Sequence, residues 1–331
     1  MDNIKFNALV VEELEKNVFS RKICEKSIDD LPDGDVLIKV HYSSLNYKDA
    51  LSATGNRGVT RRYPHTPGID ASGVVVRSKS SDFRAGDNVI VTSYDLGMNT
   101  SGGFGGYIRV PADWVVRLPS NMTLKESMIL GTAGFTAGMS VFQIIKDISK
   151  ESGKILVTGA TGGVGSIAVL LLSHLGYNVA AVSGKADAHD FLKSLGAKEI
   201  ISREDAADKT GRPILNGRWA AVLDTVGGDI LATAIKSTLP WAVVTCCGLV
   251  ASPELSINVF PFILRGVKLI GIDSQDCPMN HRVDIWKSFA GKWKLSYPAN
   301  FYKEISINEL SENIDLILKG GQRGRVVVTL D

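Results

Sequence analysis

Glycines in the segment 154–168 have the spacing of a phosphate-binding turn. The segment reads Lys-Ile-Leu-Val-Thr-Gly-Ala-Thr-Gly-Gly-Val-Gly-Ser-Ile-Ala, and an apolar helical pattern continues to Leu175. Glycine permits a sharp turn and a close approach of backbone to a pyrophosphate, while a helix N-terminus attracts the phosphates. The order of strand, glycines and helix predicts dinucleotide binding, an ordinary strand-to-helix turn being the alternative. The residues expected at the pyrophosphate are Thr161, Gly162, Gly163, Val164 and Gly165.

The next apolar segment, 178–185, ends in Ser183-Gly184-Lys185. An NAD site usually ends this strand with Asp or Glu, whose carboxylate binds the ribose hydroxyls. A hydroxyl and a cation suit a 2′-phosphate instead, and Arg203, just past the next apolar run, adds a second cation. We therefore expect NADPH as the cofactor. The alternative is that Lys185 and Arg203 are solvated surface charges.

Length and composition limit what surrounds this site. The chain has 331 residues, 44% hydrophobic and 22% charged, with a net charge of +2. The length suits two domains, and the lack of a long Lys/Arg block argues against nucleic acid as a partner. No apolar run reaches membrane-spanning length, and the start, Met-Asp-Asn-Ile-Lys, lacks the apolar core of a signal peptide. We therefore expect a cytoplasmic protein without a membrane partner.

Cysteine usage agrees with a reducing compartment. The four cysteines, Cys24, Cys246, Cys247 and Cys277, lack the C-x-x-C spacing of a structural zinc site. The adjacent pair lies in the apolar run 241–248, where we interpret both as small core side chains.

The elements that must position these residues follow two patterns. Up to about Pro119, short β-type segments such as 35–41, 73–76 and 88–92 are separated by Gly, Pro and Asp turns, which predicts a compact, barrel-like domain. Beyond Pro119, helical stretches alternate with strands, which predicts a parallel sheet covered on both faces. The final strand, 324–330, would make the nucleotide domain an insertion if it returned to the first domain. The predicted strands of the sheet lie near 154–158, 178–183, 199–202, 219–224, 241–247 and 267–273.

Together these residues resemble the medium-chain dehydrogenase/reductase superfamily over essentially the full length. The likeness is greatest to its zinc-free branch of quinone oxidoreductases and acrylyl-CoA reductases. The segments that carry it are Ser44-Leu-Asn-Tyr-Lys-Asp-Ala50, Pro67-Gly-Ile-Asp70, Gly131-Thr-Ala-Gly-Phe-Thr-Ala137, Thr158-Gly-Ala-Thr-Gly-Gly-Val-Gly165, Pro261-Phe-Ile-Leu-Arg-Gly266 and Gly271-Ile-Asp-Ser274.

The resemblance implies an α/β fold with a Rossmann doubly wound parallel sheet plus a GroES-like β-barrel substrate domain, and a cleft between them. We place the GroES-like domain at 1–122 and 296–331 and the Rossmann domain at 123–295. The resemblance also implies a homodimer, commonly built through the cofactor domains. Residues that line the nicotinamide half of the cleft in such proteins correspond to Leu249, Ile263 and Ser274.

Departures from the superfamily's zinc enzymes bear on the chemistry. Zinc alcohol dehydrogenases place Cys in the segment that here reads Asn46-Tyr47-Lys48-Asp49, and His-Glu where this chain has Ile69-Asp70. Without thiolate or imidazole there, the usual ligands cannot assemble a catalytic zinc, so we expect no metal. The dispersed histidines show no ligand spacing; they are His41, His65, His174, His189 and His281. A carbonyl polarised by hydrogen bonds alone favours reduction of an already activated acceptor over oxidation of an alcohol.

Hydride from a nicotinamide adds readily to the β-carbon of an alkene conjugated to a carbonyl. The enolate that forms needs preorganised donors, and its α-carbon then takes a proton. We hypothesise that Asn46 orients substrate or ribose, that Tyr47 donates to the substrate or relays the proton, and that Asp49 holds the loop or tunes its neighbours. The alternatives are that Tyr47 only walls the cleft, that Asp49 caps a turn or helix, and that Lys48 is a solvated charge.

A basic loop suggests an anionic handle on the substrate. Arg57, Arg61 and Arg62 follow Asp49 in the chain and would meet the phosphates of a coenzyme A tail, unless the loop is merely solvated. Acrylyl-CoA or another short 2-enoyl thioester is thus the expected substrate, mainly through the resemblance. An NADPH:quinone reductase and a non-catalytic NADPH-binding sensor or structural protein are the competing hypotheses.

Overall fold

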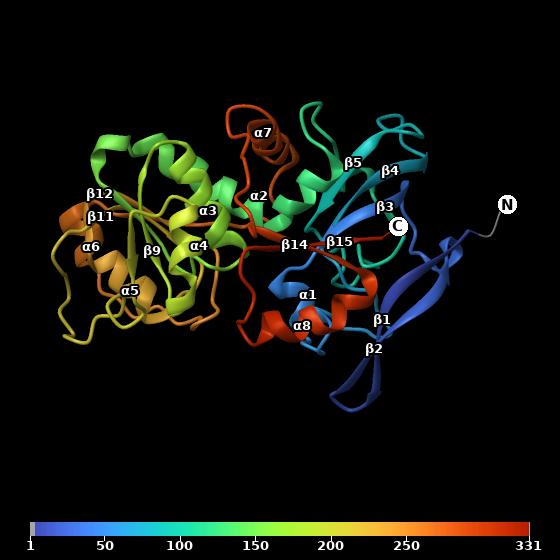
Figure 1. The fold of residues 1–331 in the computed structure, drawn as a ribbon, viewed down its shortest axis with the longest axis horizontal. Coiled ribbons are helices and arrows are strands. Elements are labelled where there is room, and N and C mark those ends of the chain that lie inside the picture. Colours follow the sequence, from blue (N-terminus) through green and yellow to red (C-terminus); the bar gives the residue numbers. More distant parts are fainter. Residues whose placement is uncertain (1–3, 331) are drawn as a thin grey trace. The chain divides into compact units, whose positions relative to one another are not determined.

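The computed structural model describes residues 4–330, which fold into two compact units (Figure 1). Unit 1 is Met1–Thr132, Gln275–Ala290 and Tyr302–Asp331, and unit 2 is Ala133–Ser274 and Gly291–Phe301. The sequence predicts boundaries at 122/123 and 295/296, whereas residues 123–132 and 275–290 pack with unit 1 and residues 296–301 pack with unit 2. One reason is Arg282, which is fully buried and donates to the carbonyl and hydroxyl oxygens of Thr92 at 3.0 and 2.9 Å.

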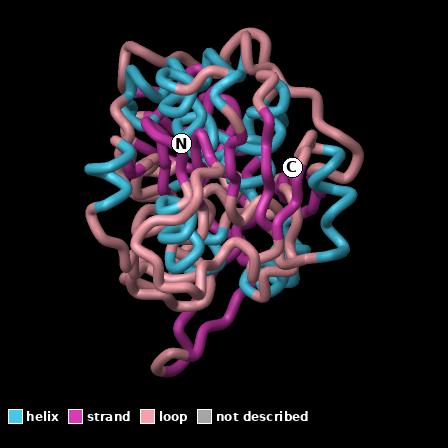
Figure 2. The backbone as a smooth tube through the Cα atoms, turned by 90° about the vertical axis from the view of Figure 1, so that its left-hand side faces the viewer, coloured by secondary structure: helices cyan, strands magenta, loops and turns pink. Residues whose placement is uncertain are grey.

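Unit 1 is built around a seven-stranded sheet in the order β14-β15-β3-β4-β5-β7, with β6 paired to β3. Neighbours are antiparallel except β14 and β15. Strands β1 and β2 form a separate hairpin, whose tip is the arm at the lower edge of Figure 2. The strands are β1 (Lys5–Glu15), β2 (Val18–Ser27), β3 (Val36–Ser44), β4 (Asp70–Ser78), β5 (Asn88–Thr92), β6 (Tyr107–Val110), β7 (Val115–Arg117), β14 (Tyr302–Ser306) and β15 (Arg325–Thr329), and the helices are α1 (Tyr47–Ser52), α7 (Met279–Ala290) and α8 (Leu310–Leu318).

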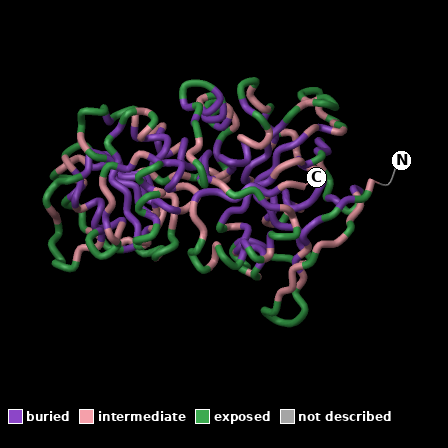
Figure 3. The backbone as a smooth tube through the Cα atoms, in the orientation of Figure 1, coloured by how far each residue is buried: buried purple, intermediate pink, exposed green. Residues whose placement is uncertain are grey.

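Alternating apolar residues explain how the sheet of unit 1 closes over a core. Val36, Ile38 and Val40 on β3 point to one side and pack with Val89 and Val91 of β5. These strands are among the buried segments in Figure 3. The predicted return of the last strand is confirmed, because β15 pairs antiparallel with β3.

Unit 2 holds a six-stranded, fully parallel sheet in the order β10-β9-β8-β11-β12-β13. Numbered along the chain, the strands lie 3-2-1-4-5-6, the order of a doubly wound dinucleotide-binding fold. The predicted α/β class is therefore confirmed. The strands are β8 (Lys154–Val157), β9 (Asn178–Val182), β10 (Glu199–Ile201), β11 (Trp219–Asp224), β12 (Thr238–Cys246) and β13 (Lys268–Gly271), and the helices wholly within the unit are α3 (Gly163–His174), α4 (His189–Ser194), α5 (Gly228–Lys236) and α6 (Phe260–Arg265).

Helix α2 (Leu124–Asp147) is kinked at Gly131, which has φ 54° and ψ −157°. By length and composition it could cross a membrane, contrary to our expectation that no apolar run is long enough. However, 72% of its apolar window is buried inside the protein. A helix in the core of a protein is also long and apolar, so the composition of α2 is not evidence for a membrane span.

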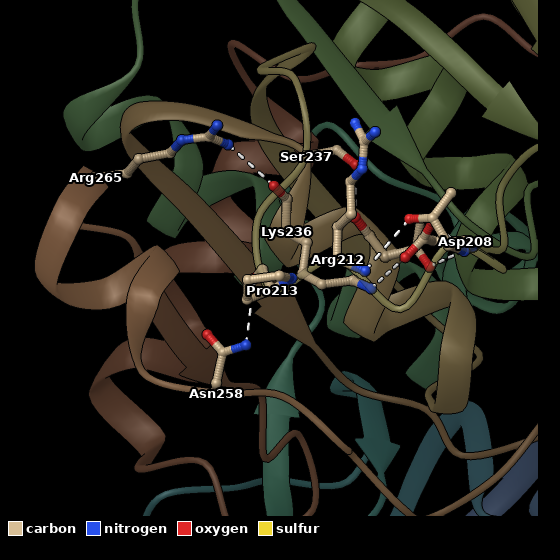
Figure 4. Close-up of polar contacts among 9 residues, drawn as sticks. Asp208, Arg212, Pro213, Lys236, Ser237, Asn258 and Arg265 are labelled. Atoms are coloured by element: carbon tan, nitrogen blue, oxygen red, sulfur yellow. Dashed lines mark hydrogen bonds and ion pairs between the residues drawn. The ribbon is translucent and has the colours of Figure 1, made fainter.

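A long segment, 202–218, connects β10 to β11 without an α-helix. Side chains from later parts of unit 2 bind this segment (Figure 4). Lys236, the last residue of α5, pairs with Asp208 at 2.6 Å, and Asn258, in the loop before α6, donates to the carbonyl of Pro213 at 3.4 Å. Arg265, at the end of α6, donates to the carbonyl of Leu215 within the segment and to those of Lys236 and Thr238, at 3.0 and 2.5 Å, just before and at the start of β12. The segment is therefore anchored near the amino ends of β11 and β12.

Candidate active site

The glycine loop of unit 2 begins at the carboxyl end of β8. Gly159 has a φ of 56°, in the left-handed region, and α3 starts at Gly163 with Gly162 as its N-cap. The first N–H groups of a helix lack carbonyl partners within the helix, so they are available to a phosphate. A Cβ on residue 165 would lie 2.3 Å from the carbonyl oxygen of Gly159, whereas a Cβ on residue 162 would meet that atom at 3.4 Å. Gly165 thus lets helix pack on strand, and Gly162 keeps the approach to the helix open, as a pyrophosphate requires.

Polar contacts join the ends of β8 and β11, between which the strand order reverses. Thr158 Oγ1 donates to Asp224 Oδ1 at 2.7 Å and accepts from the Thr225 amide at 2.9 Å. Asp224 also accepts from the amides of Val226 and Gly227 at 3.2 and 2.8 Å, and burial raises the pKa of its carboxyl. Ligands of doubly wound sheets bind outside the carboxyl ends of the strands at this reversal, so the contacts shape the floor of the expected cofactor site.

The three residues expected at a 2′-phosphate lie together. The Ser183 hydroxyl accepts from the amide of Lys185 at 3.1 Å. Strands β9 and β10 are paired in parallel, so Arg203, just beyond β10, comes to the same edge. Its Cδ and Nε atoms are each 2.8 Å from the position that a Cβ of Gly184 would take. Arg203 is exposed and Lys185 half-buried, as a site for an incoming anion requires.

Two of the three residues expected near the nicotinamide also lie at the carboxyl edge of the sheet. Leu249 follows β12, and Ser274 follows β13, where its hydroxyl accepts from Thr136 Oγ1 at 2.9 Å. Ile263 lies on α6 two residues before Arg265, which donates to the carbonyls of Lys236 and Thr238, and it is 68% exposed. Its contact with the nicotinamide stays a prediction.

In unit 1, the side-chain amide of Asn46 is fully engaged. Its Nδ2 donates to Asp70 Oδ2 at 2.7 Å, to Asp49 Oδ2 at 3.2 Å and to the Ser44 carbonyl at 3.2 Å. Its Oδ1 accepts from Arg325 Nη1 at 3.3 Å, and the residue is 8% exposed. Both the nitrogen and the oxygen of the side-chain amide are thus hydrogen-bonded within unit 1, whereas we expected the amide to contact substrate or ribose.

Asp49 is fully buried at the start of α1. Its Oδ2 accepts from the Asn46 amide at 2.8 Å and its Oδ1 from the Ile69 amide at 2.7 Å. Burial first, and the charge of Asp70 second, raise the pKa of Asp49 to about 7, while its hydrogen bonds act in the opposite sense. The geometry is that of a helix-capping carboxylate, and it also ties the helix to the strand that follows.

Asp70 and Arg325 complete this buried cluster, and both are outside the set named from the sequence. Asp70 accepts from Ser44 Oγ at 2.5 Å and from the amide and hydroxyl of Thr132 at 2.9 and 2.6 Å. Arg325 donates from Nε to the Ile129 carbonyl at 3.0 Å. The exposed fractions of Asp70 and Arg325 are 0% and 1%. The motif Pro67-Gly-Ile-Asp70 was the one sequence signal for Asp70, and no signal marked Arg325.

Tyr47 is the first residue of α1 and is 39% exposed. Its hydroxyl has no hydrogen-bond partner within residues 4–330, so it is available to a ligand. The neighbouring Lys48 is half-buried and donates to Gln275 Oε1 at 2.7 Å, which replaces the expectation of a freely solvated charge.

The three arginines of the loop after α1 have different surroundings: Arg57 is held by other side chains, and Arg61 and Arg62 are solvated. Arg57 pairs with Glu13 of the hairpin and lies over the rings of Phe19 and Tyr63 at 5.7 and 5.2 Å. Arg61 and Arg62 are exposed, and their guanidinium groups have no partner among the described residues. The loop folds back on the carboxyl end of α1, where Tyr63 donates to the Ser52 carbonyl at 2.6 Å.

Metal-holding groups and cavities in the described part of the chain, 4–330, can be set beside these residues. In the described part of the chain, no group of three or more His, Cys, Asp or Glu side chains could hold a metal ion. A cavity of about 590 Å³ is lined by residues within segment 201–219 and by Leu156, Thr233, Ala234 and Ser237. Acidic and basic side chains are mixed around it, and it contains none of the residues named above for cofactor binding.

Comparison with known proteins places this arrangement in a family. Residues 32–120 match the alcohol dehydrogenase GroES-like domain, and residues 163–286 match the zinc-binding dehydrogenase domain. The chain is 44% identical over 320 residues to the Bacillus subtilis protein named putative quinone oxidoreductase YhfP, covering 96% of this chain and 97% of YhfP. A crystal structure of B. subtilis YhfP with NAD bound has a TM-score of 0.95 and covers 99% of this chain and all of that one, at 43% identity.

Two further relatives are similar over the same length. Acrylyl-CoA reductase AcuI of Ruegeria pomeroyi is 39% identical over 328 residues, covering 98% of this chain and 99% of AcuI. The yhdH oxidoreductase of Salmonella enterica, solved in complex with NADP, has a TM-score of 0.94 at 39% identity and covers 98% of this chain and 100% of that one. Since relatives at this level of identity span nearly the whole sequence, the chain belongs to the medium-chain dehydrogenase/reductase superfamily, in the zinc-free oxidoreductase branch that includes YhfP and AcuI.

Proposed function

We propose that this chain is an NADPH-dependent reductase that saturates the C=C bond of a short 2-enoyl-CoA thioester, acrylyl-CoA being the favoured substrate. The observation that carries the proposal is the grouping of Ser183, Lys185 and Arg203 at one edge of the sheet, with no carboxylate at the end of β9. An oxidoreductase with such an edge selects a phosphorylated dinucleotide. The R. pomeroyi relative named acrylyl-CoA reductase supports the substrate.

The residues of unit 2 fit the dinucleotide in two places. The N-terminus of α3 would hold the pyrophosphate, and Ser183, Lys185 and Arg203 would hold the 2′-phosphate. When bound, the nicotinamide supplies the hydride. The relative crystallised with NADP agrees with the preference, while the relative crystallised with NAD shows that the fold also admits the other dinucleotide.

Tyr47 is the residue of unit 1 that we assign to the reacting thioester. Addition of hydride to the β-carbon leaves negative charge on the thioester oxygen, and a proton then completes the α-carbon. A tyrosine that is 39% exposed, and whose hydroxyl has no hydrogen-bond partner among the described residues, is suited to donate to that oxygen or to relay the proton through water. Asn46 and Asp49 are engaged with one another and so support this residue rather than the substrate.

Arg61 and Arg62 are the residues that we assign to the coenzyme A phosphates. Their exposed guanidinium groups can form bidentate contacts with phosphate oxygens. Arg57 is excluded from this role, since its guanidinium is held by Glu13 and two aromatic rings.

The deciding experiment follows NADPH oxidation by its absorbance with acrylyl-CoA and 1,4-benzoquinone offered in parallel. Efficient turnover of acrylyl-CoA with slow quinone reduction supports the proposal. Preference for the quinone would favour a quinone reductase, which the name of YhfP makes the second candidate. Tight NADPH binding without turnover of either acceptor would point to a non-catalytic sensor or structural protein.

We also propose that the protein acts in the cytoplasm as a homodimer joined through unit 2. Strand β13 is the last strand of its sheet, so one edge of its backbone is unpaired within the sheet. Around it, Trp241, Ile263, Leu264 and Leu269 are 74, 68, 65 and 37% exposed. Exposed apolar side chains beside an open strand edge are typical of a surface that a second copy covers.

A further inference from the structure

The orientation of the Asn46 amide is determined by its surroundings. Two carboxylates and a carbonyl accept from its Nδ2, and a guanidinium donates to its Oδ1. A flipped amide would set Nδ2 against Arg325 and Oδ1 against the carboxylates of Asp49 and Asp70, so every contact would become repulsive. Asn46 is thus held in one rotamer inside a cluster that is almost wholly buried.

Asp70 is the acceptor to which the donors of this cluster converge. Ser44, Asn46 and Thr132 donate to its two carboxylate oxygens, from one amide nitrogen, one side-chain amide and two hydroxyls. The kink of α2 contributes to this packing, because a Cβ on Gly131 would lie 2.4 Å from both Asp70 Oδ2 and Ser44 Oγ. A neutral amide at position 70 could not satisfy these donors, since one of its two terminal atoms is itself a donor.

Arg325 holds the opposite side of the cluster. Its Nη1 donates to the Leu45 carbonyl at 3.2 Å and to Asn46 Oδ1 at 3.3 Å, so it contacts two consecutive residues of the turn into α1. Being 1% exposed, it also brings a positive charge into a region that contains two buried carboxylates. Asp70 and Arg325 therefore hydrogen-bond from two sides to Asn46, the residue that immediately precedes Tyr47.

We propose that Asp70 and Arg325 are positioning residues for Tyr47, acting through the side-chain amide of Asn46. This inference rests on the proposed function of the Tyr47 hydroxyl. Asn46 is the N-cap of α1 and Tyr47 its first residue, so rotation of Asn46 changes the backbone that carries the tyrosine ring. Catalysis by a donor group depends on its placement to within a fraction of an ångström, which a clamp made of short buried hydrogen bonds can provide.

Two neighbouring serines give a matched pair of variants. Ser43 and Ser44 are both fully buried on β3, but the Ser43 hydroxyl donates to the backbone carbonyl of Asp70 at 2.6 Å, whereas the Ser44 hydroxyl donates to its carboxylate at 2.5 Å. Each Ser→Ala change removes one buried hydrogen bond, so the two variants should lose similar stability. We expect Ser44→Ala to lower kcat with acrylyl-CoA about fivefold and Ser43→Ala to leave kcat within about twofold. Equal effects of the two variants on kcat would overturn the proposal.

A double-mutant cycle tests whether the effect passes through Tyr47. Asp70→Asn is expected to lower kcat about tenfold or more, with the dissociation constant of NADPH unchanged, and to have under about a twofold effect in a Tyr47→Phe background. An Asp70→Asn loss that is equally large in both backgrounds would show that Asp70 acts elsewhere. If Asp70→Asn fails to fold, the serine pair still decides the question.

A readout independent of turnover separates this inference from the proposed function. Amide hydrogen exchange of the peptide that spans residues 46–52 should be faster in Ser44→Ala than in Ser43→Ala. An enzyme inactive with every acceptor, but showing this difference, would refute the assigned reaction while retaining the clamp. Identical exchange in the two variants would refute the clamp whatever the activity.

Discussion

In unit 2 the side chain of Arg203 packs across the backbone of Gly184, with its Cδ and Nε atoms each 2.8 Å from the position of a Cβ at residue 184. The contact joins the turn after β9 to the residues after β10. It holds a guanidinium beside the Ser183 hydroxyl and Lys185, at the point where an NAD-specific fold would have a carboxylate. We therefore expect mutations at Ser183, Lys185 or Arg203 to change the preference between NADPH and NADH.

Replacing Lys185 by Glu should reverse the preference for the phosphorylated cofactor. We expect the KM for NADPH to rise about tenfold or more, with the KM for NADH within about twofold, because a charge-assisted contact becomes a repulsion. Steady-state kinetics with both cofactors measure this. Lys198→Glu is the matched control, since Lys198 is exposed and lies at the amino end of β10; an equal change there would mean that net charge, not the site, sets selectivity.

Two glycines of the same loop should respond differently to alanine. Gly165→Ala places a Cβ 2.3 Å from the Gly159 carbonyl oxygen and should cost about 1–3 kcal/mol of unfolding free energy. Gly162→Ala meets that atom only at 3.4 Å and should leave stability nearly unchanged while weakening NADPH binding. Denaturant unfolding and fluorescence titration separate the two effects. Equal losses of stability would contradict the assignment of Gly165 to packing and Gly162 to the cofactor.

Asp49 should make the stability of the protein depend on pH. Burial raises the pKa of Asp49 to about 7 in the folded state from its ordinary value of 3.8, so between these values the folded state binds more protons than the unfolded state. The stabilisation is complete below about pH 4 and is lost as pH rises through about 7, amounting to as much as about 4 kcal/mol. Unfolding free energies from pH 5 to 8 should fall more steeply for the wild type than for Asp49→Asn. Parallel profiles would show that Asp49 is ionised throughout this range.

The basic loop should distinguish a thioester from an uncharged acceptor. The double variant Arg61→Ala/Arg62→Ala is expected to raise the KM for acrylyl-CoA about three- to tenfold and leave that for 1,4-benzoquinone unchanged, because only the thioester carries phosphates. Arg77→Ala is a suitable control, since Arg77 is exposed on β4. A KM for acrylyl-CoA that is insensitive to the double change would remove the coenzyme A contact from the proposal.

The apolar surface beside β13 should govern oligomeric state. Introducing charges by Ile263→Arg together with Leu264→Arg is expected to shift the protein from dimer to monomer in sedimentation or light scattering, since two desolvated charges would face their own copies. Leu316→Arg on α8 is the control, because Leu316 is 44% exposed in unit 1. A wild-type protein that is monomeric at micromolar concentration would contradict the dimer outright.

Local patterns determined most of the fold and the cofactor half of the site. Strand, glycine and helix signals depend on residues close together in the chain, so the doubly wound unit and the cluster of Ser183, Lys185 and Arg203 could be inferred directly. The partners of Arg265 at the end of α6 could not, because they are backbone carbonyls 27 to 50 residues earlier in the chain. Helix α7 likewise packs with unit 1 through Arg282, which donates to Thr92, 190 residues away in sequence.

The tertiary structure alone decided the contacts around Tyr47. The sequence marked the segment Asn46–Asp49 as chemically interesting, but it assigned the Asn46 amide to a ligand. In the fold, that amide meets Asp70 and Arg325, which are 24 and 279 positions distant. The physical reason is that a buried polar group must find a partner, while the identity of the partner depends on which distant strands the sheet brings together.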